Sequence, residues 1–309
     1  MNVTSQMSNK KVVVGFSVAI LAVVLWSGNF IVARGLAKSI PPVQLSLLRW
    51  STASILLLPF AFSKTKQQWN LIIQHRRYLL GTAFIGISLF NTLLYFGGHY
   101  TQAINLAIIG TSASPVFSTF LAAIFLKEKI GIARITGMLL CLWGVLFLMT
   151  KGNWQHLQLL KFSTGDIWVF LSAFLFAVYT IMVKKKPAPI DATVFLFIII
   201  TAGTLLLIPL LWIQPFFLQQ KMIWTPNTSW IILYLGLGAS VLAYLCWNKA
   251  IPLLGAARTA LLGNLIPVFS TVEAVIFLGE AFSNIHLISS IIIITGLIIA
   301  NLPKRKKEI

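Results

Sequence analysis

The sequence is dominated by apolar blocks of roughly 20 residues, which short polar connections separate. An α-helix rises about 1.5 Å per residue, so such a block crosses a hydrocarbon core of about 30 Å. Of the 309 residues, 58% are hydrophobic and only 10% are charged, against about 25% charged in a typical soluble domain. Because a backbone in lipid must satisfy its own hydrogen bonds, we expect helices. The chain is therefore predicted to be an all-α membrane protein.

The order of the blocks predicts ten transmembrane helices, each close to the length that a bilayer requires. The expected ranges are 12–33, 42–62, 78–98, 104–126, 132–150, 166–183, 193–213, 230–248, 257–279 and 285–302.

The basic residues are distributed unevenly over the connections. Of the 24 Lys and Arg residues, 18 fall in the N-terminal segment and every second segment after it, five fall in the others, and Arg49 lies inside a block. Positive charge is retained on the cytoplasmic side, so we expect a multi-pass protein of the inner membrane with both termini in the cytoplasm. The net charge of +18 does not indicate nucleic-acid binding, because that needs a basic face on a folded soluble domain.

The reactive residue types form no pattern that predicts an enzyme, a metal site or a cofactor. Cys141 and Cys246 lie within apolar blocks, which argues against a disulfide framework. The four histidines lack the spacing of metal ligands, and the six acidic residues are scattered. The sequence has no GxxxxGK[ST] loop to hold a nucleotide. We therefore expect no catalytic residue, metal or cofactor.

An internal repeat runs through the chain. The segment PVFST occurs at residues 115–119 and again at 267–271, 152 residues later. The same offset relates Glu128 to Glu280. The chain is thus predicted to be a duplicated five-helix unit. Because five is odd, the second copy must cross the membrane in the opposite direction, as in many secondary transporters, whose substrate site lies near the midplane between the repeats.

Four short segments, in the right order, resemble the EamA-like family of the drug/metabolite transporter superfamily. They are Trp26-Ser27-Gly28-Asn29-Phe30, Leu48-Arg49-Trp50, and the two blocks that run from PVFST to Glu128 and to Glu280. The resemblance covers nearly the whole chain and implies two inverted five-helix repeats, residues 12–150 and 163–302. It also implies the export or exchange of amino acids or other small metabolites across the inner membrane by alternating access.

Two prolines occupy repeat-related positions in the expected fourth and ninth helices. Pro115 and Pro267 each remove one backbone hydrogen bond and free the carbonyl four residues earlier, at Thr111 and Gly263. Such a carbonyl is tolerated where it meets water, substrate or a neighbouring side chain. We expect both prolines to line the substrate pathway, and a kink that serves only packing is the alternative.

Ionisable residues inside the blocks give further candidates for a site. Glu273 and Arg49 lie at about the same depth, about 10 Å from the outer ends of their helices, and an acid and a base in low dielectric pair if their helices are neighbours. Either Arg49 binds a substrate carboxylate while Glu273 binds an ammonium group or a proton, or the two form a structural pair. The expected cluster is Trp26, Asn29, Arg49, Asn91, Tyr95 and Glu273.

The aromatic residues and the charge count bear on the cargo. Tyr179, like Trp26, is placed to stack on a flat or cationic substrate, although most such residues pack or anchor helices. We expect a small-molecule substrate, first of all amino acids or related zwitterionic or neutral compounds. A sugar-phosphate or nucleotide-sugar exchanger is the alternative, but such cargo needs several buried cations and Arg49 is alone. A channel is the third alternative class, although the sequence contains no recognisable selectivity filter.

Overall fold

The computed structural model is helical throughout the part of the chain that it describes. That part is residues 3–36, 39–101, 103–153, 155–156, 163–217, 220–278 and 282–301, and within it the side chains of 3–9, 29–36, 103–108, 217, 274 and 277–278 are not described.

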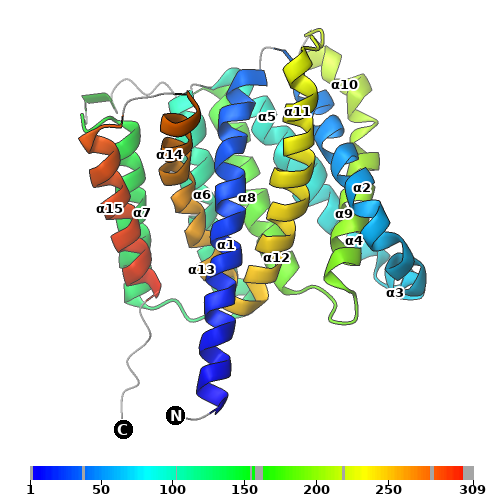
Figure 1. The fold of residues 1–309 in the computed structure, drawn as a ribbon, viewed down its shortest axis with the longest axis horizontal. Helices are drawn as coiled ribbons and strands as arrows, with labels where there is room; N and C mark the ends of the chain where they lie inside the picture. Colours follow the sequence, from blue (N-terminus) through cyan, green and yellow to red (C-terminus); the bar gives the residue numbers. More distant parts are fainter. Residues whose placement is uncertain are drawn as a thin grey trace.

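The helices stand side by side and form one bundle (Figure 1). In chain order they are α1 (Val3–Leu36), α2 (Pro42–Gln67), α3 (Trp69–Gln74), α4 (Arg76–Ala83), the π-helical segment η1 (Phe84–Leu89), α5 (Phe90–Tyr100), α6 (Ala103–Leu126), α7 (Ile132–Met149), α8 (Thr164–Lys184), α9 (Ala192–Leu207), α10 (Leu210–Phe217), α11 (Pro226–Gly236), the π-helical segment η3 (Leu237–Leu242), α12 (Ala243–Leu254), α13 (Ala256–Leu262), the 3₁₀ turn η4 (Gly263–Leu265), α14 (Ile266–Leu278) and α15 (Asn284–Asn301).

The described helices match an all-helical membrane protein. Eight of them are long and apolar enough to cross a bilayer, or nine if α9 and α10, which meet at an angle of 45°, form one bent span. The remaining expected span, 257–279, is not one continuous helix, because the 3₁₀ turn η4 divides it into α13 and α14. The large side chains on the outside are apolar, as at Phe60, Trp212 and Phe216, which suits a surface in contact with lipid.

Each π-helical segment lies in the third long helix of its half of the sequence. The segment η1 continues α4 into α5, and η3 continues α11 into α12. Phe84–Leu89 and Leu237–Leu242 are related by an offset of 153 residues, close to the offset of the PVFST segments. π-Helical turns are rare and occur frequently at functional sites, so a matched pair directs attention to these two helices.

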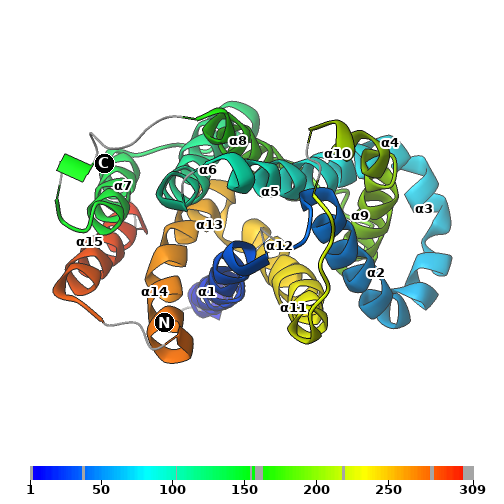
Figure 2. The same ribbon diagram turned by 90° about the horizontal axis from the view of Figure 1, so that it is seen from above.

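Two three-helix groups face each other across the centre of the molecule. The first bundle, as we name it, is α1 packed against α11–α12 and α13–α14, and the second bundle is α8 packed against α4–α5 and α6. Figure 2 shows the first bundle on one side and the second on the other. Each bundle therefore takes helices from both halves of the sequence.

Two further helix pairs flank these bundles, and each pair is antiparallel. In the first pair Ser54 of α2 contacts Thr201 of α9 at 2.7 Å, while Lys64, nearer the end of α2, contacts Asp191, before the start of α9. In the second pair α7 packs against α15. There a Cβ on Gly296 would lie 2.7 Å from the Gly137 carbonyl, so the backbones are in direct contact.

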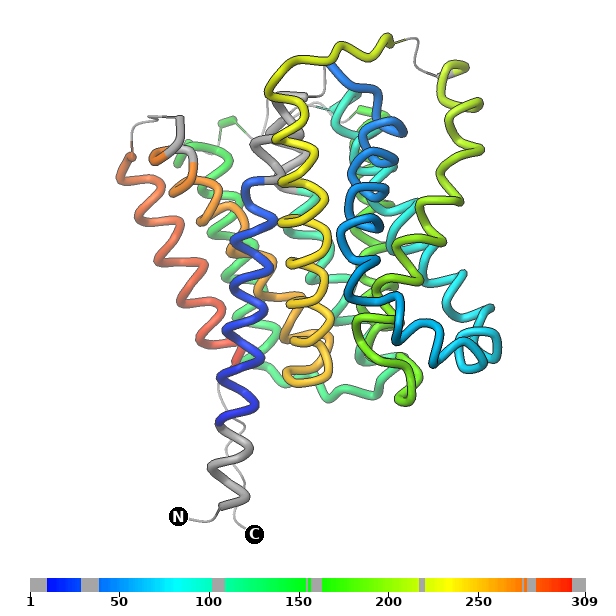
Figure 3. The backbone as a smooth tube through the Cα atoms, turned by 45° about the vertical axis from the view of Figure 1, so that its right-hand side comes forward, coloured from blue at the N-terminus to red at the C-terminus, as the bar shows by residue number. Residues whose placement is uncertain are grey.

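The first described residues of α1 and the last residues of α15 lie at the same end of the molecule, which we call the terminal end (Figures 1 and 3). The connections from α6 to α7 and from α12 to α13 also lie there. At this end Asp191 begins α9, because its carboxylate accepts hydrogen bonds from the Thr193 and Val194 backbone N–H groups at 2.8 and 3.4 Å. Burial alone would raise the pKa of Asp191, but these N–H groups and Lys64 lower it below its usual value.

Candidate functional site

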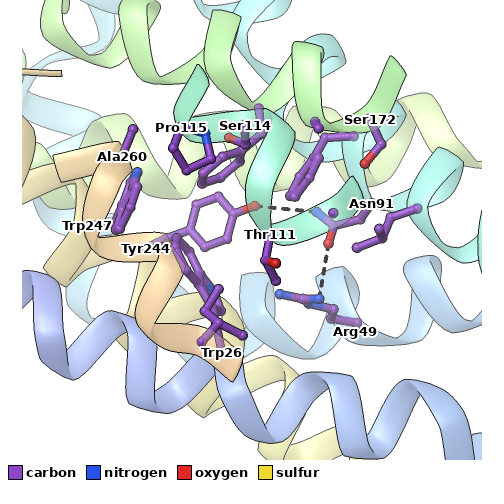
Figure 4. Close-up of a pocket in the computed structure, with 17 residues that line it drawn as sticks. Trp26, Arg49, Asn91, Thr111, Ser114, Pro115, Ser172, Tyr244, Trp247 and Ala260 are labelled. Carbon is purple, nitrogen blue, oxygen red and sulfur yellow. Dashed lines mark hydrogen bonds between the residues drawn. The ribbon is translucent and has the colours of Figure 1, made fainter. Parts of the chain in front are cut away.

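A cavity lies at the centre of the molecule between the first and second bundles. The empty space in and directly around it, open solvent included, is about 680 Å³. Its walls come from α1, α12 and α13–α14 on one side and from α5, α6 and α8 on the other, with one residue, Arg49, from α2. Figure 4 shows the side chains of these helices converging on it. A pocket between the helices of a bundle is a common place for a small-molecule site.

Arg49 is fully buried, with 1% of its surface exposed. Its Nε donates to Ser240 Oγ at 2.6 Å, and one terminal nitrogen donates to Asn91 Oδ1 at 3.1 Å and to Tyr95 Oη at 2.9 Å. Its guanidinium also lies over the ring of Trp50, 4.8 Å from the ring centre. The side chain is therefore held in one position by groups from α2, α5 and η3.

The π-helical segment η3 supplies a backbone acceptor to this network. A π-helical turn shifts the backbone hydrogen bonds from residue i+4 to residue i+5. The Ala239 carbonyl in this turn accepts from the second terminal nitrogen of Arg49 at 2.9 Å and from Trp26 Nε1 at 2.9 Å. Arg49 of α2 and Trp26 of α1 are thus fixed to the same atom.

The charge of Arg49 is not neutralised by a protein carboxylate. No carboxylate in the described part of the chain lies within 4 Å of it, and the described residues that line the cavity include no Asp or Glu. A buried charge without a counter-ion is costly, and here hydrogen bonds and the Trp50 ring supply the compensation. The cavity therefore has a positive potential that favours an anionic group.

Aromatic rings form the wall of the cavity next to Arg49. Trp26 lies against Trp247, Tyr244 and Phe176, with ring centres 4.9, 5.6 and 5.5 Å apart. Tyr244 also contacts Asn91, whose amide lies 3.4 Å from its hydroxyl (Figure 4). This arrangement offers an apolar surface beside a fixed cation.

The two repeat-related prolines have different surroundings. Pro115 lies inside the continuous helix α6 and lines the cavity together with Thr111 and Ser114. Pro267 is the second residue of α14, directly after the 3₁₀ turn η4, and it is not among the cavity-lining residues, although Gly263 and Ile266 are. Of the two prolines that we expect to line the pathway, only Pro115 lines this cavity.

Glu273 does not pair with Arg49, contrary to the expectation from depth alone. Its Oε1 accepts from Ser27 Oγ of α1 at 2.6 Å, and its buried Oε2 has no hydrogen-bond partner. Figure 2 shows the reason: α1 and α11–α12 stand between α14 and α2. Two residues at one depth meet only if their helices are neighbours, and the order of helices around the bundle is not visible in the sequence.

The other expected site residues divide between the cavity and its surroundings. Trp26 and Asn91 line the cavity, and Tyr95 contacts it only through Arg49. Tyr179 is fully buried on the terminal side of the cavity and donates to Asn248 Oδ1 at 2.8 Å. The side chain of Asn29 lies outside the described part of the chain.

Sequence reasoning missed the part that two residues, Trp247 and Ser240, have in the site. Tyr244 and Trp247 line the cavity, and Ser240 binds Arg49. Ser240 and Gly236 have the four-residue spacing that is typical of close helix contacts. Gly236 makes only such a contact, with Thr52 of α2, whereas Ser240 also binds Arg49. The signal that could have singled out Ser240 is its place beside a buried arginine, which depends on the fold.

Comparison with known proteins identifies the family. The model of the EamA-like transporter family matches residues 13–150 and 163–302. The uncharacterized transporter YyaM of Bacillus subtilis is 27% identical over 253 residues, which are 81% of this chain and 80% of that protein. One solved crystal structure has a TM-score of 0.74 at 18% identity and covers 95% of this chain and 96% of its own, which shows a shared fold.

Two relatives have names that mention a cargo. The "Probable amino-acid metabolite efflux pump" of Escherichia coli is 25% identical over 294 residues, 91% of this chain and 92% of that protein. The "Probable terminal-alkyne amino-acid exporter" of Streptantibioticus cattleyicolor is 27% identical over 288 residues, 91% of each chain.

Proposed function

The chain belongs to the EamA-like transporter family, and from this premise we propose that it is a secondary transporter that exports amino acids or related small zwitterionic or neutral metabolites across the inner membrane. The observation that carries the proposal is the central cavity with one fully buried cation, Arg49, and an aromatic wall. A carrier needs one site that binds its cargo near the midplane between two movable groups of helices, and the two bundles provide such groups.

Arg49 is the residue that we propose binds the carboxylate of the cargo. A guanidinium binds a carboxylate through charge-assisted hydrogen bonds, and the cavity holds no protein carboxylate among its described residues to compete. Trp26, Tyr244 and Trp247 would then contact the remainder of the cargo, by packing or, for an ammonium group, by cation–π attraction. The names of the Escherichia coli and Streptantibioticus relatives point in the same direction.

A cargo with several fixed negative charges fits this cavity less well. Sugar phosphates and nucleotide sugars need several cations to replace the water that they lose on binding. Arg49 is the one ionisable cation among the described residues that line the cavity. The composition of the wall therefore favours a single carboxylate over a phosphate or pyrophosphate.

We also propose that the chain forms ten spans as two inverted repeats, 12–150 and 163–302, with both termini in the cytoplasm. The matched π-helical segments η1 and η3, the antiparallel pairs α2–α9 and α7–α15, and the 18 to 5 distribution of basic residues support this proposal. On this assignment α13, η4 and α14 together make the ninth span, broken at Gly263–Leu265.

Glu273 is a candidate for coupling transport to protons. It has no cationic partner within 4 Å in the described part of the chain, and one of its oxygens is buried without a hydrogen bond. Acidic groups in membrane helices commonly carry protons in transporters. Glu273 contacts Ser27 of α1, which directly follows the cavity residue Trp26 in the chain. A proton on Glu273 would therefore be close to the proposed cargo site.

Counter-flow in reconstituted vesicles tests the proposed function. Vesicles loaded with unlabelled amino acid should accumulate the labelled compound transiently and saturably, because a carrier exchanges cargo across one site. A channel would give uptake that neither saturates nor responds to internal cargo. A panel of amino acids, matching decarboxylated amines and sugar phosphates would identify the class, and accumulation of the amines or the phosphates in place of the amino acids would contradict the role of Arg49.

A further inference from the structure

Three polar contacts join the first bundle to the second on the terminal side of the cavity. They connect Glu128 to the start of α13, Lys184 to the end of α12, and Tyr179 to Asn248 within α12. We call them the terminal-end contacts. Each joins a residue in α8, or directly after α6, to an element of the first bundle.

Glu128 makes the contact furthest from the cavity. It follows α6 directly after Lys127, whose φ of 54° turns the chain sharply. Its Oε1 accepts from the Ala256 backbone N–H at 3.0 Å, and its Oε2 lies 3.6 Å from a terminal nitrogen of Arg134. The carboxylate thus attaches the beginning of α13 to the end of α6, and Arg134 holds it in position.

Gly255 gives the Glu128 carboxylate the room that it needs. The φ of Gly255 is +91°, a conformation that other residues rarely adopt. A Cβ at this position would meet Oε1 and Oε2 of Glu128 at 3.0 and 3.3 Å. An alanine here would displace the carboxylate and strain the turn between α12 and α13.

Lys184 and Tyr179 continue the contact along α8 toward the cavity. Lys184 Nζ donates to the carbonyls of Ile251 and Pro252 at 3.4 and 3.1 Å. Tyr179 lies more than one turn earlier on α8 and donates to Asn248 Oδ1 at 2.8 Å. Its ring contacts Phe176, a cavity-lining residue, with centres 6.0 Å apart. Along α8, the contacts of Lys184 and Tyr179 with the first bundle therefore lead to Phe176 in the aromatic wall of the cavity.

We propose that the terminal-end contacts are the gate that closes the cavity toward the terminal end, with Glu128 as its outermost positioning residue. Opening that end requires α13 and α12 to separate from α6 and α8, and this breaks all three contacts together. The inference rests on the proposed transport by alternating access. The gate adds to that proposal the residues that hold one end of the cavity closed, and these residues are distinct from Arg49, the proposed cargo-binding residue.

Labelling of a cysteine in the cavity from each side of the membrane tests the gate. The reporter is Ser114→Cys in a chain carrying Cys246→Ala, with Cys141 retained because it is fully buried. A membrane-impermeant maleimide is applied to either face of vesicles whose orientation a C-terminal tag reports. Glu128→Gln should raise the labelling rate from the terminal side about tenfold, since hydrogen bonds to a charged group are among the stronger ones. Gly255→Ala should do the same.

Lys64→Gln is the matched control. It removes an ion pair at the same end, Lys64 to Asp191 at 3.2 Å, but one that joins α2 to α9 rather than the two bundles. Its labelling rate should stay within twofold of the parent chain. Reaction of Cys141 with the maleimide would reveal a variant that is unfolded. In that case the double variant Tyr179→Phe, Lys184→Gln replaces it, and we expect the same rise in labelling from the terminal side.

Unchanged terminal-side labelling in the folded gate variants would overturn the proposal. So would a parent chain that already reacts equally fast from both sides, and that result would also contradict a carrier. Labelling needs no cargo. A negative result for the gate variants therefore leaves the proposed transport standing, because counter-flow tests transport separately.

Discussion

At the scale of single residues, the charge of Arg49 organises the site. Four groups from two elements, α5 and η3, accept hydrogen bonds from its guanidinium, and none of them carries a negative charge. Breaking hydrogen bonds to a buried charge is expensive, so the position of Arg49 is fixed before any cargo arrives. Such preorganisation reduces the cost of binding an anionic group.

Arg49→Lys should therefore weaken transport although it keeps the charge. An ammonium group cannot reproduce the planar fork that reaches Ser240, Asn91 and the Ala239 carbonyl at once. We expect the cargo concentration for half-maximal counter-flow to rise by about tenfold or more, which is about 1.4 kcal/mol. Ser240→Ala, which removes one hydrogen bond and no charge, should have a smaller effect. Cargo affinity equal to that of the parent chain in Arg49→Gln would exclude a direct role.

Glu273→Gln addresses coupling. If Glu273 carries a proton during transport, the amide should abolish the response of counter-flow and uptake to an imposed pH gradient, because an amide does not titrate in this range. Ser27→Ala removes the hydrogen bond to Glu273 Oε1 but leaves the carboxyl group, so it should shift the pH response without removing it. A pH response that survives in Glu273→Gln would rule this residue out as the coupling group.

At the scale of elements, the breaks in helical geometry coincide with the site. The segment η3 presents the Ala239 carbonyl to Arg49 and Trp26, and the turn η4 places Gly263 at the cavity wall. By contrast, α7 and α15 are regular helices that pack backbone to backbone through Gly137 and Gly296. Two irregular elements thus reach a site that regular helices otherwise form, and the pair α7–α15 flanks it.

Gly296→Ala should destabilise the protein through this pair. Its Cβ would lie 2.7 Å from the Gly137 carbonyl and 2.8 Å from Cys141 Sγ, and overpacking of this kind typically costs about 1–3 kcal/mol. Gly81→Ala is the matched control, because the nearest atom to its Cβ would be 3.8 Å away and alanine favours a helix by about 1 kcal/mol. Thermal unfolding in detergent, followed by the exposure of Cys141 to a thiol-reactive dye, should give a lower Tm for Gly296→Ala only. Equal Tm values would contradict close packing of α7 on α15.

At the scale of the whole molecule, each bundle combines helices from both halves of the sequence. Helix α1 packs with α11–α14, and α8 packs with α4–α6. The cavity therefore lies between two groups that each combine distant parts of the sequence, and α13 of the first bundle packs against α6 of the second. In the proposed alternating access, these two bundles are the units that would move.

A topology measurement tests the arrangement at this scale. The start of α1 and the end of α15 lie at one end of the molecule, and the basic residues favour the cytoplasm for that end. Fluorescent protein that matures only in the cytoplasm should therefore be bright when fused to either terminus, and periplasmic alkaline phosphatase should be inactive at both. A bright signal at one terminus alone would require an odd number of spans.

The sequence by itself determined the helical membrane class and the family, and four of the residues that it singled out line the cavity. Block length and the cost of unpaired polar groups in lipid act locally along the chain, so they can be read without the fold. Arg49, Asn91 and Pro115 stood out for the same reason, because a polar group or a proline inside an apolar block is expensive wherever that block packs.

Only the tertiary structure decided which of these residues meet. It put α1 between Arg49 and Glu273, turned Ser240 and the Ala239 carbonyl toward Arg49 through a π-helical segment, and divided the ninth expected span at Gly263–Leu265. Depth along a helix follows from the rise per residue, but the order of helices around a bundle depends on the sum of many side-chain contacts between distant segments. No local pattern contains that sum.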